Sequence, residues 1–164
     1  MSYYDATAKG YLELHGEEQL RKARTVLAYL KQHKLIDAST RLLDVGAGTT
    51  HATALFPGDR TAIEPSKELL KQAKDASIKL VHGSAESLPF VDKWFDVVIC
   101  LTAIHNFTDI EKGLDELKRV ASKTVVITVL KKSPKHDAII KAINKRFKTI
   151  ATLDDVTDTI LVLT

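Results

Sequence analysis

Two acids and two glycines, spaced as in a nucleoside-binding site, are the residues of this chain best suited to bind a ligand. Asp44, Gly46 and Gly48 lie within residues 41–50 (RLLDVGAGTT), and Glu64 follows Asp44 by twenty residues. Glycine lets the backbone turn sharply and come close to a ligand, where a Cβ would clash. An acid at the end of the next strand can accept hydrogen bonds from both hydroxyls of a ribose. The pattern predicts the first two strands of a nucleoside-binding sheet.

The glycine loop departs from the fingerprint of dinucleotide-binding proteins. That fingerprint needs a third glycine at position 51, which His51 occupies. Asp44 would repel a nearby phosphate but would attract an ammonium group. S-adenosylmethionine carries an ammonium group, a sulfonium and a ribose, and it has no phosphate. An acid for the ammonium group and Glu64 for the ribose therefore favour this cofactor over NAD or ATP.

Five segments of the chain follow the order and spacing of a known family. They are residues 42–48 (LLDVGAG), 62–66 (AIEPS), 83–90 (GSAESLPF), 95–105 (FDVVICLTAIH) and 116–120 (ELKRV). They resemble the glycine-rich motif, the ribose-binding strand end, the adenine-side loop, the fourth strand with its following turn, and the helix before the fifth strand. The family is the class I S-adenosylmethionine-dependent methyltransferases, in particular the small quinone-biosynthesis-like type. The resemblance covers nearly the whole chain.

The resemblance implies a set of cofactor contacts. It assigns them to Asp44, Gly46, Ala47, Gly48, Glu64, Pro65, Ser84, Ala85, Glu86, Leu101 and Thr102. Two positions depart from the family pattern. Thr50 stands where a third small residue is common, and Ser84 stands where an aspartate is common. A serine can still bond an adenine amino group, although less strongly than a carboxylate can.

The N-terminal residues resemble the family's Y-D-x-x-A-x-x-Y segment, which often folds over the cofactor. Tyr4 and Tyr11 are seven residues apart, so a helix would place them on one face. The hypothesis is that residues 1–15 form a lid and that both tyrosines contact the cofactor. The alternative is a frayed terminus with aromatic anchors in the core.

His105 follows the predicted fourth strand and is the candidate catalytic residue. A histidine near the transferred methyl group could take a proton from the acceptor, because its pKa lies near neutrality. The alternative is a histidine at a helix start that bonds the backbone. His15 and His51 are weaker candidates. The His, Asp and Glu residues show no metal-ligand spacing, so no metal is predicted.

Composition fits one ordinary globular domain. The chain has 164 residues, of which 45% are hydrophobic, and a formal net charge of +3. No apolar run approaches the roughly 20 residues of a membrane span, and no signal peptide is recognisable. The single cysteine, Cys100, is expected to be a small core residue. These features predict one methyltransferase domain over residues 1–164, in a reducing, cytoplasmic setting, without membrane contact.

Apolar patterning predicts the elements that position these residues. A helical pattern covers residues 16–34. Helices are expected to alternate with the first five strands, one opening at Ser66, one with a capping box at 108–111, and one at Ser133-Pro134. The fold is predicted to be α/β and Rossmann-like, with a seven-stranded, mostly parallel sheet, helices on both faces and an antiparallel last pair. The predicted strands are residues 41–45, 60–64, 78–82, 95–101, 124–130, 147–152 and 158–163.

The expected reaction is methyl transfer by in-line displacement to an unidentified acceptor, which is a small molecule, a protein or an RNA. A basic stretch after the fifth strand could steer an anionic substrate or RNA, or it could be a solvated helix face, which is favoured. The alternative function is a cofactor-binding module or a non-catalytic subunit that activates a partner, including an RNA-associated one. The sequence leaves the oligomeric state open.

Overall fold

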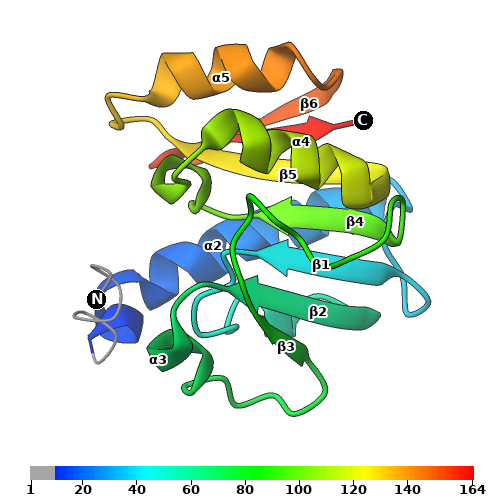
Figure 1. Cartoon of the computed structure of the whole chain (residues 1–164), viewed down its shortest axis with the longest axis vertical. Helices are drawn as coiled ribbons and strands as arrows, with labels where there is room; N and C mark the ends of the chain where they lie inside the picture. Colours follow the sequence, from blue (N-terminus) through cyan, green and yellow to red (C-terminus); the bar gives the residue numbers. More distant parts are fainter. Residues whose placement is uncertain (1–9) are drawn as a thin grey trace.

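Seven strands form one sheet in the computed structural model, which describes residues 10–164 (Figure 1). The strands are β1 (Arg41–Val45), β2 (Asp59–Glu64), β3 (Lys79–His82), β4 (Phe95–Cys100), β5 (Ala121–Leu130), β6 (Thr149–Asp154) and β7 (Asp158–Leu163). Their spatial order is β3-β2-β1-β4-β5-β7-β6. Strands β1 to β5 run parallel, and β7 pairs antiparallel with both β5 and β6. The predicted fold class is confirmed.

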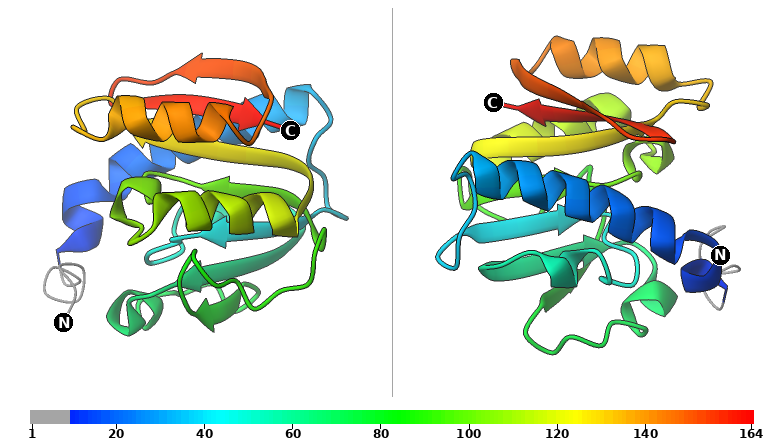
Figure 2. Two further views of the ribbon diagram at one scale, coloured as in Figure 1. Left: turned by 45° about the horizontal axis from the view of Figure 1, so that its top comes forward. Right: turned by 180° about the vertical axis from the view of Figure 1, so that it is seen from behind.

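Helices lie on both faces of this sheet. The long helix α2 (Tyr11–Gln32) crosses one face, and α4 (Ile110–Val120) and α5 (His136–Asn144) cover the other (Figure 2). The shorter elements are α3 (Lys67–Leu70), η1 (Thr53–Leu55) and η2 (Ile104–Asn106). None of the helices over residues 10–164 is long and apolar enough to cross a membrane.

The central strands are apolar on both sides because each side packs against helices. Successive residues of a strand point to opposite faces of the sheet. In β1, Leu42 packs in the cluster with α2, whereas Leu43 packs in the cluster with α4 and α5. In β4, Val97 and Val98 divide in the same way. This double cover explains the nearly continuous apolar runs of β4 and β5.

Several predicted helices differ from the structure. Between β1 and β2, where all connecting residues are described, the chain forms only the short η1, and between β3 and β4 it forms no helix. The predicted capping box at 108–111 is wrong by one residue, because Asp109 caps α4 by accepting a 3.0 Å bond from the Lys112 N–H. Ser133-Pro134 forms a turn, and α5 begins at His136.

The order of the strands creates a crevice at one edge. The chain adds β2 and β3 on one side of β1, and it adds β4 on the other side. The loops that leave β1 and β4 therefore separate at the carboxyl ends of these strands. Ligands of open α/β sheets bind at such a reversal. Four of the five family-like segments end in the loops after β1, β2, β3 and β4, and so their last residues lie at this edge: residues 42–48, 62–66, 83–90 and 95–105.

Candidate cofactor-binding site

Both glycines of the loop after β1 adopt a backbone conformation that favours glycine, and Gly46 in addition has no room for a side chain. Gly46 and Gly48 have φ values of +74° and +57°, in the left-handed region that glycine enters without steric cost. A Cβ added to Gly46 would lie 2.4 Å from the Cβ of Ala103. The N–H groups of Gly46 and Ala47 both donate to the carbonyl of Ile63, at 2.9 and 3.2 Å. These bonds fix the loop against β2.

Glu64 is held at the tip of β2 by the backbone around it. Its carboxylate accepts a 3.0 Å bond from the Gly48 N–H and a 2.9 Å bond from the Ser66 N–H. The side chain is buried, with 5% of its surface exposed. The oxygens of an ionised carboxylate accept such bonds, so these two bonds fix the orientation of the group. Glu64 therefore faces the crevice in a fixed orientation.

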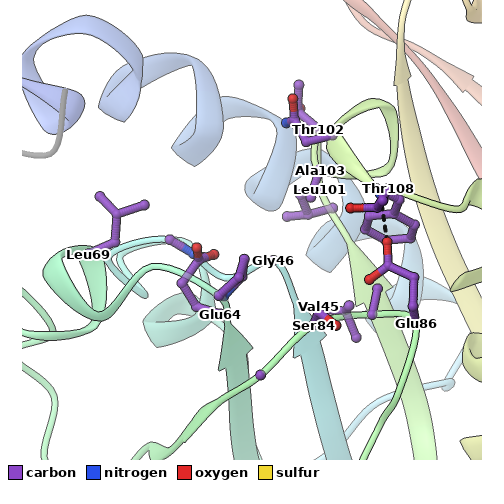
Figure 3. Close-up of a pocket in the computed structure, with 16 residues that line it drawn as sticks. Val45, Gly46, Glu64, Leu69, Ser84, Glu86, Leu101, Thr102, Ala103 and Thr108 are labelled. Carbon is purple, nitrogen blue, oxygen red and sulfur yellow. Dashed lines mark hydrogen bonds between the residues drawn. The ribbon is translucent and has the colours of Figure 1, made fainter. Parts of the chain in front are cut away.

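A cavity of about 270 Å³ opens at this edge (Figure 3). Glycine-loop residues and Glu64 form one side, the loop after β3 forms another, and residues after β4 complete the wall. The cavity brings together nine of the predicted cofactor residues: Gly46, Gly48, Glu64, Pro65, Ser84, Ala85, Glu86, Leu101 and Thr102. The structure adds apolar side chains that the sequence pattern did not identify: Val45, Leu69, Ala103 and Phe107.

Glu86 bridges two walls of this cavity. Its carboxylate accepts bonds from the backbone N–H groups of Thr108 and Asp109, at 2.7 and 3.3 Å, as the dashed line in Figure 3 shows for Thr108. These donors stand at the start of α4, where N–H groups lack partners within the helix. Glu86 thus links the loop after β3 to the loop before α4.

Asp44 lies in a second, smaller cavity beside the first. This cavity of about 30 Å³ is lined by Asp44 and Ala47 together with Gly16 and Gln19 of α2. Gly46 and Leu101 line both cavities, so the two spaces are neighbours. Burial raises the pKa of Asp44 to about 7; the 2.6 Å bond from the Thr53 hydroxyl opposes this rise, and the charge of Glu64 adds to it. A cationic ligand would favour the ionised form of Asp44.

Neither His105 nor Cys100 is among the residues that line the two cavities. His105 belongs to η2 and is half-buried, and its Nδ1 has no partner among residues 10–164. Burial lowers its pKa, and the nearby charge of Asp158 opposes that shift. Cys100 is fully buried, as expected of a core residue, and burial raises the pKa of its thiol.

The remaining predictions fall in different places. Tyr4 lies outside the described residues, and so does most of the predicted lid. Tyr11 begins α2, and its side chain also lies outside the description. His51 lines the smaller cavity and is 3.2 Å from the Thr49 hydroxyl, whereas His15 is exposed on α2.

The basic stretch after β5 is partly neutralised. Lys131 pairs with Asp154 at 2.6 Å, and Arg146 pairs with Asp115 at 2.6 Å and with Glu111. These exposed pairs favour the interpretation of this stretch as a solvated helix face.

One group of residues beside the site was missed in the sequence. Lys22 of α2 is fully buried and forms a 2.7 Å ion pair with Asp158, which is also fully buried. Both contact the hydroxyl of Thr102, a residue of the larger cavity wall. The available signal is that Lys22 precedes Val26 by one helical turn and therefore lies on the apolar face of α2.

Comparison with known proteins identifies a family. Residues 43–129 match the family described as "Methyltransferase domain". An uncharacterised methyltransferase of Bacillus subtilis, YcgJ, is 33% identical over 93 residues, which cover 51% of this chain and 37% of that protein. A demethylmenaquinone methyltransferase of Chlorobaculum tepidum is 34% identical over 103 residues, covering 61% of this chain and 41% of that protein. The chain thus spans about two fifths of the length of these relatives.

Solved structures agree on the fold. A crystal structure described as a SAM-dependent methyltransferase from Aquifex aeolicus superposes with a TM-score of 0.76. The superposition covers 99% of this chain and 98% of that one, at 16% sequence identity. At this identity the likeness supports the Rossmann-like arrangement of the sheet and helices.

Proposed function

Because this chain belongs to the class I S-adenosylmethionine-dependent methyltransferases, we propose that it transfers a methyl group from S-adenosylmethionine to an acceptor bound at the edge of the sheet. One observation carries the proposal. Glu64 is oriented by the Gly48 and Ser66 N–H groups, and it lines the larger cavity together with Gly46 and Gly48. A carboxylate placed in this way suits a ribose and not a phosphate.

The larger cavity suits the adenosine half of the cofactor. Glu64 would accept hydrogen bonds from the ribose hydroxyls. The Ser84 hydroxyl and the backbone of Ala85 lie in the wall where an adenine ring would end, and Leu69 and Phe107 provide apolar surface for its faces. Mostly apolar walls with a few placed polar groups are typical of cofactor sites. Glu86, which also lines the cavity, joins this wall to Thr108 and Asp109 through its bonds to their N–H groups.

The smaller cavity suits the amino-acid end of the cofactor. Asp44 would pair with the ammonium group there, next to Gly46 and Leu101, which line both cavities. Gly16 and Gln19 of α2 line this space, so α2 would cover the amino-acid end there. We therefore assign the start of α2, and the residues before it, a role in covering the site.

The sulfonium of the cofactor supplies an already reactive methyl group, so the protein mainly needs to align the partners and exclude water. The wall formed by Leu101, Thr102 and Ala103 would lie beneath the methionine half. His105 follows directly and is the nearest candidate to accept a proton if the acceptor arrives protonated. Its lowered pKa keeps the ring neutral near pH 7, as a base requires.

The site supports an inference about the methyl acceptor less directly than one about the cofactor. One relative is named a demethylmenaquinone methyltransferase. A hydroquinone is therefore the first acceptor to test. Protein and RNA acceptors come next, because residues 10–164 contain no second folded unit beside the sheet that could enclose a small acceptor.

The experiment is a transfer assay with methyl-labelled S-adenosylmethionine. Reduced quinones, protein fractions and RNA fractions are the acceptors, and wild type is compared with Glu64→Ala. Glu116→Gln is a matched control, since Glu116 also accepts a backbone N–H bond (2.8 Å from Leu88) but lies away from the cavities. We expect labelled product from wild type and from the control, and little from Glu64→Ala. Cofactor binding without product in any fraction would contradict catalysis and favour a non-catalytic subunit.

A further inference from the structure

A buried ion pair connects three distant parts of the chain next to the cofactor cavity. The ammonium group of Lys22 in α2 lies 2.7 Å from Asp158 Oδ1 and 2.6 Å from Glu18 Oε1. It also donates a 2.8 Å bond to the hydroxyl of Thr102. Lys22 and Asp158 are both 0% exposed. A lysine is almost never fully buried unless it is paired, so this arrangement calls for a reason.

Stability alone is a weak reason for such a pair. Taking two charges out of water costs several kcal/mol per ion, and a well-packed apolar pair is often as stable or more stable. Val26, one helical turn after Lys22, and Ile160, two residues after Asp158, pack in an apolar cluster. An apolar pair at positions 22 and 158 would extend this cluster, although it would remove partners of Glu18, Thr102 and Thr157. The charges must contribute something that apolar side chains cannot.

The residue that the pair contacts is unusual in its backbone. Thr102 has a φ of +55°, and positive φ is a genuine outlier for a β-branched residue. It also lines the cofactor cavity, between Leu101 and Ala103. Such strain persists only where the surroundings over-determine the conformation.

Both donors of Thr102 are bonded to residues that do not line either cavity. Its N–H donates a 2.7 Å bond to the hydroxyl of Thr128, and its own hydroxyl donates a 2.9 Å bond to Asp158 Oδ2. Thr128 is fully buried in β5. The hydroxyl of Thr102 also accepts the bond from Lys22. The Thr102 hydroxyl is thus committed to its neighbours and not to a ligand.

We propose that Lys22, Asp158 and Thr128 are positioning residues of the cofactor site. They hold Thr102 in the left-handed conformation, and this conformation sets the course of the backbone from Leu101 to Ala103 along the cavity wall. The proposal rests on the proposed function, because the wall is the one assigned to the methionine half. The ion pair and its bonds to Thr102 also connect α2, which lines the smaller cavity, to the end of β4.

Thr128→Val tests the proposal with little change of shape. Thr124→Val is the matched control, since Thr124 is also buried, on the same strand and the same face, but at its other end. In Thr128→Val the Thr102 N–H loses its acceptor. We expect S-adenosylhomocysteine to bind about tenfold more weakly to Thr128→Val, as small misplacements in a site can cause, and equally well to the control. Unchanged affinity in Thr128→Val would overturn the proposal.

The double variant Lys22→Met/Asp158→Val separates positioning from stability. It replaces the ion pair by apolar side chains, while Glu18 keeps its 3.1 Å bond from Thr157. We expect a thermal midpoint near that of wild type together with weakened cofactor binding. Adding Thr102→Gly should restore most of the affinity, because glycine adopts positive φ without support. Full affinity in the double variant, or no recovery with glycine, would overturn the proposal.

Amide hydrogen exchange at Thr102, measured without cofactor, keeps this test independent of the proposed function. We expect faster exchange in Thr128→Val than in wild type or in Thr124→Val. Failure of wild type to bind S-adenosylhomocysteine would contradict the proposed function alone. Equal exchange at Thr102 in all three proteins would contradict the positioning role alone.

Discussion

Gly46 and Ala103 approach so closely that a methyl group on Gly46 would lie 2.4 Å from the Cβ of Ala103. The two residues end neighbouring strands, since Gly46 follows β1 and Ala103 lies just beyond β4. Gly46 lines both cavities, and Ala103 lines the larger one. The glycine therefore serves packing and ligand access at the same position.

Gly46→Ala should reduce cofactor binding strongly. The new Cβ would push Ala103 and the cavity wall apart, and the φ of +74° adds about 1–3 kcal/mol of strain. Gly58→Ala is the control, since Gly58 has a φ of +96° and a Cβ there would meet the carbonyl of Thr40, outside both cavities. Titration with S-adenosylhomocysteine should show a loss for Gly46→Ala only, although both variants lower the unfolding midpoint. Equal affinities would contradict the role of Gly46.

Asp44→Asn should stabilise the cofactor-free protein at alkaline pH. The folded pKa of about 7 lies above the unfolded value of 3.8, so the carboxyl stabilises the fold fully below pH 3.8, and this stabilisation is lost as the pH rises through about 7. The loss amounts to about 4 kcal/mol, at about 1.4 kcal/mol per pKa unit. Urea unfolding at pH 5 and pH 8 should show about 2.7 kcal/mol of this loss, since pH 5 lies about two units below the folded pKa. The free energy of unfolding of Asp44→Asn, relative to that of wild type, should be higher at pH 8 than at pH 5. An equal difference at the two pH values would show that the pKa of Asp44 is not raised.

Cofactor binding should release a proton near neutral pH. Without ligand, Asp44 is partly protonated at pH 6.5, and pairing with the ammonium group would ionise it. Affinity should therefore fall as the pH drops below about 7. Calorimetry at pH 6.5, in two buffers of different ionisation enthalpy, gives the number of protons released. Buffer-independent heats in wild type would argue against contact between Asp44 and the ammonium group. Asp44→Asn provides the reference without this proton.

Glu86→Ala should weaken both the start of α4 and the cofactor site. The carboxylate accepts bonds from the Thr108 and Asp109 N–H groups, and it is partly exposed, so we expect a loss of about 1 kcal/mol in stability. Glu86→Gln keeps an acceptor oxygen and should lose less stability and less affinity for S-adenosylhomocysteine. Unfolding and S-adenosylhomocysteine titration of the two variants test this. Glutamine behaving like alanine would indicate that the negative charge at the helix start matters more than the bonds.

The sequence predicts the sheet well because its strands are covered on both faces. Continuous apolar and β-branched runs such as those of β4 and β5 are typical of strands that are buried on both faces. Helix starts are harder to predict, since neighbouring residues compete for the same cap. Thr108 and Asp109 are both good caps, and only the structure shows that Asp109 takes this role. Ser133-Pro134 fits a helix start by type, but it forms the turn before α5.

Some residues of the candidate site could likewise be predicted from the sequence, and others could not. Glycines and acids at strand ends carry a local signal, so residues such as Gly46 and Glu64 can be assigned from their spacing. The position of Lys22 on the apolar face of α2 indicates its burial, but no local signal identifies Asp158 as its partner. Their pairing depends on α2 crossing the sheet to β7, which is a property of the whole fold. The bonding partners of Glu86 could not be predicted locally either, since they belong to the next loop.

Calorimetric titration of wild type and Glu64→Ala with S-adenosylhomocysteine, with NAD as comparison ligand, tests the central claim most directly. The account predicts saturable one-to-one binding to wild type and weak binding of NAD. It also predicts a loss of about 1.5–3 kcal/mol in Glu64→Ala, the size of hydrogen bonds to a charged group. Equal affinity of wild type and Glu64→Ala, or NAD binding as tight as S-adenosylhomocysteine, would contradict it.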